Sequence, residues 1–161
     1  MTKAVYIHIP FCKQICTYCD FCKFYYNENW IKKYLKALNK EIKTMYKGDE
    51  ISSIYIGGGT PSSLDIKYLE ELFKIISSFN INKQVEFTIE CNSEDVDKEK
   101  LLLFKKYGVN RLSIGIQTFD EEMLKKLNRK INLSNIKLAL SMFENVNLDL
   151  MYALPKQSLK S

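Results

Sequence analysis

Short apolar segments alternate with amphipathic helical segments along the 161-residue chain, and this alternation limits the fold more than any other feature. The apolar segments are rich in Ile, Val, Tyr and Leu, which is typical of short strands buried in a parallel sheet. We predict strands at residues 4–9, 51–56, 85–90, 110–115 and 146–151. Because a helix between successive strands makes those strands parallel, the sequence predicts an α/β fold.

The segments between the strands carry apolar residues at helical spacing. The expected apolar faces are Ile31, Leu35, Leu38, Ile42 and Met45 in the first helix, Leu69, Leu72, Phe73 and Ile76 in the second, and Ile136, Ala139, Leu140 and Phe143 in the last. A third helix is predicted over residues 97–107, ending at Gly108, because glycine is the usual left-handed cap. Asp120 and Ser134 are the predicted N-caps of two further helices.

The length and the 46% hydrophobic content fit one domain with a substantial core. About five βα units are too few for a complete barrel, so we predict a partial (β/α) TIM-like barrel over residues 1–161 that is truncated at its C-terminal side. After a Leu154-Pro155 turn, another helix is expected to begin at Ser158. The formal net charge of +5 is expected to reflect solvated helix faces, so no nucleic-acid partner is predicted, although an anionic small ligand would suit it.

Four of the five cysteines crowd into residues 12–22. Cys12, Cys16 and Cys19 have the spacing C-x3-C-x2-C and directly follow the first predicted strand, in a segment without helical periodicity. A [4Fe–4S] cluster needs thiolates that converge from a loop, and three thiolates leave one iron without a protein ligand. Such an iron can bind the amino and carboxylate groups of a small molecule, and an electron from the cluster can then break a C–S bond in a bound sulfonium.

A zinc site with Cys22 as the fourth ligand is the alternative. Zinc ribbons usually contain two separated C-x2-C pairs, and the sequence has no second pair. Cys91 follows the third predicted strand and is expected to be a buried small residue. No signal peptide is recognised and no apolar run approaches the ~18 residues of a membrane span, so we expect a cytoplasmic protein, in which clustered cysteines usually bind metals.

A series of motifs follows the cysteines in one order along the chain. They are Tyr6-Ile7-His8-Ile9-Pro10-Phe11-Cys12 with the cysteine motif, Gly57-Gly58-Gly59-Thr60-Pro61, Ser113-Ile114-Gly115-Ile116-Gln117-Thr118-Phe119, Asn147-Leu148-Asp149-Leu150-Met151 and Leu154-Pro155-Lys156-Gln157-Ser158. Together they resemble the radical SAM superfamily, whose members use S-adenosyl-L-methionine (SAM). More narrowly, they are similar to the oxygen-independent coproporphyrinogen III oxidase-like family and its heme-chaperone (HemW) branch.

The resemblance implies that Cys12, Cys16 and Cys19 ligate a [4Fe–4S] cluster. It further implies that SAM is bound by, or lies near, Tyr6, Tyr18, Gly58, Gly59, Thr60, Glu90, Gln117, Arg129 and Asp149. Glycines after the second strand would let the backbone approach the SAM amino group, although a flexible turn would also explain them. Taken singly, Glu90 could cap a strand and Arg129 could be a solvated helix-end cation. Glu90, Gln117 and Asp149 all lie at or near the carboxyl ends of predicted strands, where barrel active sites are built.

Phe21 bears on the branch within this family, whereas Ala153 and His8 raise separate points. Coproporphyrinogen oxidases resemble C-x3-C-x2-C-x-C, and the last position of that motif is Phe21 here, which favours the heme-chaperone branch. Ala153 stands where the family often has glycine. His8, the only histidine, is expected to pack behind the cluster, with heme ligation as the alternative.

The first hypothesis is therefore a heme-chaperone-like radical SAM protein of heme metabolism. The resemblance implies heme or a porphyrin as a ligand, a heme-acceptor protein, and an electron donor such as flavodoxin or ferredoxin. It also implies a C-terminal domain with a heme-binding HNxxYW segment, which this sequence lacks. The second hypothesis is an oxygen-independent coproporphyrinogen III dehydrogenase, and the third is a zinc-binding module. No catalytic residue is assigned.

Overall fold

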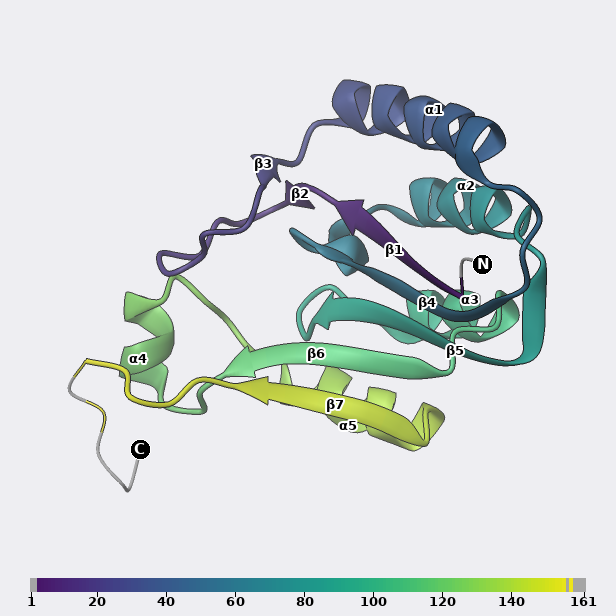
Figure 1. Cartoon of the computed structure of the whole chain (residues 1–161). Helices are drawn as coiled ribbons and strands as arrows, with labels where there is room; N and C mark the ends of the chain where they lie inside the picture. The colour runs from purple at the N-terminus through teal and green to yellow at the C-terminus, as the bar shows by residue number, and fades with distance from the viewer. Residues whose placement is uncertain (1–2, 156, 158–161) are drawn as a thin grey trace.

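A five-stranded parallel sheet forms the centre of the computed structural model, which describes residues 3–155 and 157 (Figure 1). Its strands, in spatial order, are β1 (Ala4–Ile9), β4 (Ile51–Gly58), β5 (Ile81–Asn92), β6 (Arg111–Gln117) and β7 (Asn145–Leu150). The spatial order equals the chain order, so the sheet winds in one direction as in a barrel and does not reverse as in a doubly wound fold. All five predicted strands are confirmed, although β5 begins at Ile81 and not at residue 85.

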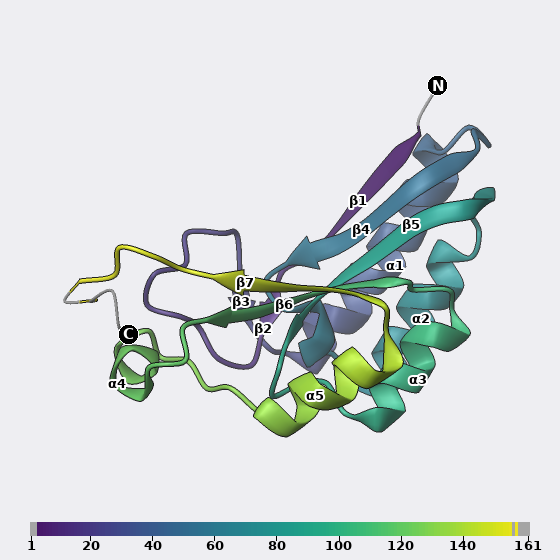
Figure 2. The ribbon, with the colours of Figure 1, turned by 90° about the horizontal axis from the view of Figure 1, so that it is seen from below.

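Helices cover one face of this sheet (Figure 2). They are α1 (Glu28–Met45), α2 (Ile66–Ile76), α3 (Lys98–Lys106) and α5 (Leu133–Met142). The predicted apolar faces are buried except at two positions, since Met45 is 69% exposed and Leu140 is 50% exposed. Met45 is the last residue of α1, and Leu140 lies in the last turn of α5, which packs behind the outermost strand. Helical spacing alone does not show where a helix passes the edge of the layer beneath it.

Polar side chains cap the helix N-termini as the sequence predicts, with one correction. Asp120 accepts a hydrogen bond from the amide of Met123 at the start of α4 (Glu121–Lys126). The N-cap of α5 is Asn132 and not Ser134, because the Asn132 side chain accepts from the amide of Asn135. An asparagine and a serine cap equally well, so the sequence did not distinguish two candidates two residues apart.

The two faces of the sheet differ because side chains alternate along each strand. Ile54, Ile56, Ile89, Leu112 and Ile114 are fully buried in the core beneath the helices. Side chains at the alternate strand positions, among them Tyr, Glu, Ser and Asp, point to the opposite face. No helix among the described residues covers that face (Figure 2). Polar groups therefore line this open face, towards the carboxyl ends of the strands.

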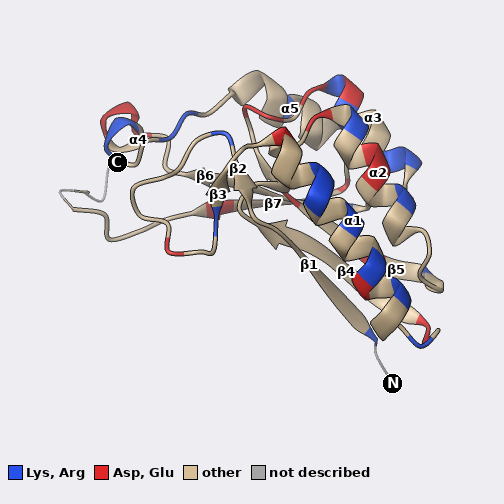
Figure 3. Ribbon diagram, turned by 90° about the horizontal axis from the view of Figure 1, so that it is seen from above, with Lys and Arg blue, Asp and Glu red and all other residues tan. Residues whose placement is uncertain are grey.

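Charged residues of both signs are interspersed over the outer surfaces of α1, α2 and α3 (Figure 3). Their ion pairs are exposed, as in the Lys67–Glu28 pair at 3.1 Å, and contribute little to stability. This agrees with the prediction that the net positive charge reflects solvated helix faces. No helix among residues 3–155 is long and apolar enough to cross a membrane.

Beyond β7, Ala153 has a φ of +61°, in the left-handed region that favours glycine. A β-carbon there costs about 1 kcal/mol, which gives a physical reason for the glycine that the family often has at this position. The helix predicted to begin at Ser158 lies outside the described residues.

Candidate functional site

The loop that carries the cysteines runs from β2 (Phe11–Cys12) to β3 (Phe24–Tyr25), two short paired strands that fix its base. Its tip is fixed by contacts with the end of α4. The amide of Thr17 donates to the carbonyl of Leu127 at 3.3 Å, and the Asn128 side chain donates to the carbonyl of Ile15 at 2.8 Å. The side chain of Gln14 in turn donates to Asn128 Oδ1 at 2.7 Å. The loop is therefore held at both ends before any ligand binds.

The three thiols of the C-x3-C-x2-C motif line one cleft of about 570 Å³ at the carboxyl ends of the strands. Cys12 is buried, whereas Cys16 and Cys19 are half-buried. Cys22 is exposed and does not line the cleft. Its carbonyl accepts a hydrogen bond from His8 Nε2 at 2.8 Å, so this part of the loop turns towards β1. The structure thus separates Cys22 from the other three cysteines.

Most of the residues that the resemblance assigns to SAM meet in the same cleft. They are Tyr18, Gly58, Gly59, Thr60, Glu90, Gln117, Arg129 and Asp149. Tyr6 does not line this cleft, because it is the third residue of β1 and lies away from the carboxyl end of the strand. Its hydroxyl hydrogen-bonds to His8 Nδ1 at 3.0 Å, and its ring lies beside that of Tyr55 on the open face of the sheet, with 6.0 Å between the ring centroids.

The glycines at the end of β4 are required by their neighbours within the protein. A β-carbon at Gly58 would lie 2.8 Å from the ring of His8, and one at Gly59 would lie 2.9 Å from Cys12 Sγ. Gly57 is similarly close to Glu90. His8 therefore packs behind the glycine turn that faces the cysteine loop, and flexibility alone does not account for the three glycines.

We expect Gly58→Ala to lower the free energy of unfolding by about 3 kcal/mol, because the new methyl group would overlap His8 and the backbone has a φ of +119°. Denaturant unfolding would measure this loss. Gly48→Ala is the matched control, since Gly48 also has a positive φ of +88° but a β-carbon added there would meet no atom within 4 Å. Equal losses in the two variants would contradict the steric argument.

Two carboxylates project into the cleft from the open face of the sheet. Glu90 accepts hydrogen bonds from the hydroxyl of Tyr55 at 2.7 Å and from the amide of Gly58 at 3.0 Å. Asp149 accepts from the hydroxyl of Ser113 at 2.9 Å and from the side chain of Asn147. Burial, reinforced by the hydrogen bond to Glu90, raises the pKa of Tyr55, so this hydroxyl stays protonated and serves as a donor. Both carboxylates are therefore held in fixed positions by neighbouring strands.

Arg129 lies in the centre of the site although it is only 8% exposed. Its guanidinium donates to Asn92 Oδ1 at 2.7 Å and to the carbonyl of Gly115 at 2.5 Å, and it lies 3.9 Å from Cys16 Sγ. Its buried Nε has no hydrogen-bond partner among the described residues. The sequence alternative of a solvated helix-end cation is therefore wrong for Arg129.

Gln117 ends β6 with a φ of +71°, in the left-handed region that few residues other than glycine adopt. Its carbonyl accepts a hydrogen bond from the amide of Met151 at 2.8 Å, which fixes the segment after β7 beside it. Backbone strain of this kind concentrates at functional sites, where surrounding contacts must maintain it.

The environments of the buried thiols differ. Burial raises the pKa of Cys12, and a hydrogen bond from Thr60 acts in the opposite direction. Burial also raises the pKa of Cys91, which is buried as predicted and whose Sγ contacts the carbonyl of its own strand at Ile89. Burial likewise raises the pKa of Tyr18, the residue between two of the loop cysteines.

Sequence reasoning missed Asn92 and Ser113, which complete the polar lining of the cleft, and Tyr55, whose hydroxyl donates to Glu90. Tyr55 and Ser113 sit at alternate positions of strands that are otherwise apolar on their buried face. A polar residue at every second position near the end of a buried strand was the signal that could have identified them.

The donor set suits an iron–sulfur cluster. Thiolates are the ligands that iron–sulfur clusters take, and the three thiols come from one loop and border one cleft. Within residues 3–155, no three His, Cys, Asp or Glu side chains converge closely enough to hold a single metal ion. A cluster does not need that convergence, because each thiolate binds a different iron.

Comparison with known proteins settles the family. Residues 6–161 match the radical SAM superfamily. The chain belongs to the radical SAM superfamily. This membership favours an iron–sulfur site over the zinc module that the cysteines alone left open.

Two kinds of relative share this domain. The chain is 41% identical to "Heme chaperone HemW" of Bacillus subtilis, over 98% of this chain and 44% of the relative. It is 32% identical to "Oxygen-independent coproporphyrinogen III oxidase" of Escherichia coli, over 98% of this chain and 37% of the relative. The solved structure of coproporphyrinogen III oxidase (HemN) from E. coli superposes with a TM-score of 0.89 and 32% identity, over 99% of this chain and 39% of that one. The chain therefore spans less than half the length of these relatives.

Proposed function

We propose that this chain binds a [4Fe–4S] cluster through Cys12, Cys16 and Cys19, and binds SAM in the adjoining cleft as part of a HemW-type heme chaperone. The observation that carries the proposal is the convergence of these three thiols on a cleft lined by Arg129 and Asp149. Residues 1–161 would then form an incomplete radical SAM core. A cytoplasmic location is part of the proposal, because thiols remain reduced there.

Several features of the cleft support SAM as its ligand. The amino acid part of SAM carries a positive ammonium group and a negative carboxylate group. The cleft presents groups of both signs, namely the carboxylates of Glu90 and Asp149 and the guanidinium of Arg129. The Nε of Arg129 is buried without a partner among the described residues, so an anionic group such as the SAM carboxylate can accept from this guanidinium. Gly58 and Gly59 leave the backbone beside the cysteine loop without side chains that would block a ligand.

When bound, the cluster would supply one electron to SAM, which is the reductive chemistry by which a sulfonium C–S bond is cleaved. The residues of the chain would hold the partners of this reaction. The loop between β2 and β3 presents three thiolates, while Glu90 and Asp149 are kept in place by Tyr55 and Ser113. Because the carboxylates are oriented before the ligand arrives, little ordering remains to be done on binding.

The heme-chaperone branch is favoured by Phe21, which occupies the position of the fourth cysteine in coproporphyrinogen oxidases. Its side chain is 70% exposed and borders the cleft. The higher identity to a HemW relative, 41% against 32%, supports the same branch. Heme or a porphyrin, a heme-acceptor protein and a flavodoxin or ferredoxin as electron donor are the partners that we propose on this basis.

The first experiment is EPR spectroscopy of the anaerobically reconstituted and reduced chain, with and without SAM. We expect a [4Fe–4S]⁺ signal that changes on addition of SAM, because one iron would be open to the ligand. An EPR signal that SAM does not change would contradict the SAM site. A chain that contains zinc and no sulfide would contradict the cluster. Titration with heme, followed by absorbance, then tests the chaperone assignment.

An oxygen-independent coproporphyrinogen III dehydrogenase is the second candidate, supported by the TM-score of 0.89 to the E. coli oxidase. Anaerobic incubation with coproporphyrinogen, SAM and a reductant distinguishes the two. Formation of protoporphyrinogen IX would favour the dehydrogenase, whereas heme binding without porphyrin turnover would favour the chaperone.

A further inference from the structure

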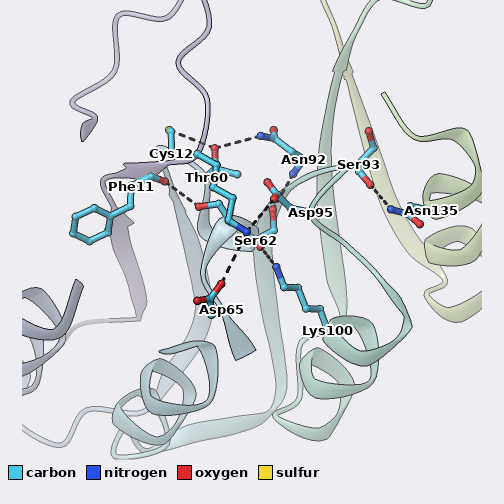
Figure 4. A network of polar contacts seen from close by, with 12 residues as sticks. Phe11, Cys12, Thr60, Ser62, Asp65, Asn92, Ser93, Asp95, Lys100 and Asn135 are labelled. Carbon is cyan, nitrogen blue, oxygen red and sulfur yellow. Dashed lines mark hydrogen bonds and ion pairs between the residues drawn. The ribbon is translucent and has the colours of Figure 1, made fainter. Parts of the chain in front are cut away.

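We infer that Asn92 is a positioning residue that directs hydrogen bonds from Thr60 and Arg129 to the cluster thiolates of Cys12 and Cys16, and thereby raises the reduction potential of the cluster. Figure 4 shows the Thr60 side of this arrangement, with Asn92 beside Thr60 and Thr60 beside Cys12. The inference rests on the proposed cluster site and extends it to a residue that coordinates nothing itself.

The position of Asn92 is fixed by a buried polar anchor beneath it. The amide of Asn92, the last residue of β5, donates to Ser62 Oγ at 3.0 Å. Ser62 belongs to the short 3-10 turn η1 (Pro61–Ser63) and is completely buried. The ammonium group of Lys100, which is 7% exposed, donates to the Ser62 carbonyl at 2.6 Å (Figure 4). Ser62 thus ties the end of β5 to the turn that begins after Thr60, and a buried lysine on α3 holds that turn.

The orientation of the Asn92 amide follows from the chemistry of its neighbours. Arg129 donates to Asn92 Oδ1 at 2.7 Å, and a guanidinium has no acceptor. The oxygen of the amide must therefore face Arg129. The Asn92 Nδ2 group then faces Thr60 Oγ1 at 3.4 Å, and an amide NH₂ can only donate.

The direction of the Thr60 hydroxyl is fixed in turn. Because Thr60 Oγ1 accepts from Asn92, its own proton is free to point elsewhere. Cys12 Sγ lies 3.4 Å away and is the acceptor. Thr60 is only 6% exposed, so water competes weakly for this proton. The same amide that turns the Thr60 proton towards Cys12 holds the guanidinium that lies 3.9 Å from Cys16 Sγ.

Hydrogen bonds to cluster sulfurs are one of the factors that set the potential of an iron–sulfur centre. A donor stabilises negative charge on the thiolate. The reduced cluster carries one more negative charge than the oxidised cluster, so donors favour the reduced state and raise the potential. The Asn92 side chain lies between two donors, and each donor faces a different thiolate. Asn92 would therefore influence the potential of the cluster through both thiolates.

The test is a double-mutant cycle on the midpoint potential of the reconstituted cluster, measured by EPR during a redox titration. Thr60→Val removes the hydroxyl at nearly constant shape, and we expect a shift to a more negative potential. Asn92→Asp keeps an acceptor for Arg129 but replaces the NH₂ donor with a second acceptor. The Thr60 proton would then turn to the new carboxylate and away from Cys12, and the potential would again become more negative.

The decisive measurement is the midpoint potential of the double variant. If Asn92 acts through Thr60, adding Thr60→Val to Asn92→Asp causes little or no further shift, because the donor has already been turned away. Additive shifts would overturn the inference, since they would mean that the two residues act independently. Ser93→Ala is the matched control, because Ser93 is buried next to Asn92 but its hydroxyl accepts from Asn132 at the start of α5. A shift in this control as large as that of Asn92→Asp would also overturn the inference.

Failure of the proposed function is distinguishable from failure of this inference. If the unsubstituted chain assembles no cluster, the proposed function fails. The network is then tested in the cluster-free chain by denaturant unfolding of Asn92→Ala, Thr60→Val and the double variant. Non-additive losses of stability would support the Asn92–Thr60 contact, and additive losses would overturn it. The same cycle applies if only a substituted chain loses its cluster.

Discussion

Replacement of Cys16 with alanine is expected to abolish the cluster, which is the largest effect that we predict. Cys16 is one of only three thiols that line the cleft apart from the buried Cys91, among the residues that the structure describes, and two thiolates rarely hold a cubane cluster. The reconstituted variant should contain almost none of the roughly four iron and four sulfide atoms of a [4Fe–4S] centre. Iron and sulfide analysis after desalting measures this, together with the loss of the EPR signal.

Cys22→Ala is the matched control for this experiment. Cys22 belongs to the same loop, but its side chain is exposed and lies outside the cleft. We expect this variant to retain essentially all of its iron and sulfide. A Cys16→Ala chain with a full cluster would show that the ligands are wrongly assigned, and loss of iron in Cys22→Ala would identify Cys22 as a ligand.

Replacement of Arg129 with alanine is expected to reduce both stability and SAM binding. The guanidinium satisfies the Asn92 side chain and the Gly115 carbonyl in a site where Arg129 is 8% exposed. Hydrogen bonds to charged groups contribute about 1.5–3 kcal/mol each, so we expect the free energy of unfolding to fall by about 3 kcal/mol. Denaturant unfolding of the cluster-free chain measures this loss.

The same substitution tests the role of Arg129 in ligand binding. In the reconstituted chain, we expect the affinity for SAM to fall at least about tenfold, which corresponds to about 1.4 kcal/mol. Equilibrium dialysis with SAM provides the measurement. Lys130→Ala is the control, because Lys130 is the exposed basic residue next in the chain and should change neither quantity. Unaltered SAM affinity in Arg129→Ala would exclude Arg129 from the SAM site.

The framework of the fold could be predicted from the sequence because local patterns determine it. Apolar β-rich runs mark all five strands of the sheet, and helical spacing marks the faces that cover it. The predictions failed where a local pattern has two equivalent solutions or continues past the layer that it packs on. The N-cap of α5 is an example of the first, and exposed Met45 is an example of the second.

The location of the site could be predicted for a similar reason. Carboxyl ends of parallel strands gather at one end of a sheet, so Glu90, Gln117 and Asp149 had to lie near one another once the strands were known. The same rule does not describe side chains in the middle of a strand. Tyr6 lies in the middle of β1, so it packs beside Tyr55 on the open face and does not line the cleft, although it belongs to the motif that leads into the cysteines.

By itself, the sequence determined the parallel sheet, the cysteine loop after its first strand and the family to which the chain belongs. Only the tertiary structure decided which polar groups lie within hydrogen-bonding reach of the thiols. Arg129 and Cys16 are 113 positions apart in the chain, and Arg129 and Asn92 are 37 apart. The physical reason is that periodicity and spacing act over a few residues, whereas a hydrogen bond depends on where distant segments are packed. The same packing left Cys22 outside the cleft and placed the Asn92 side chain between Thr60 and Arg129.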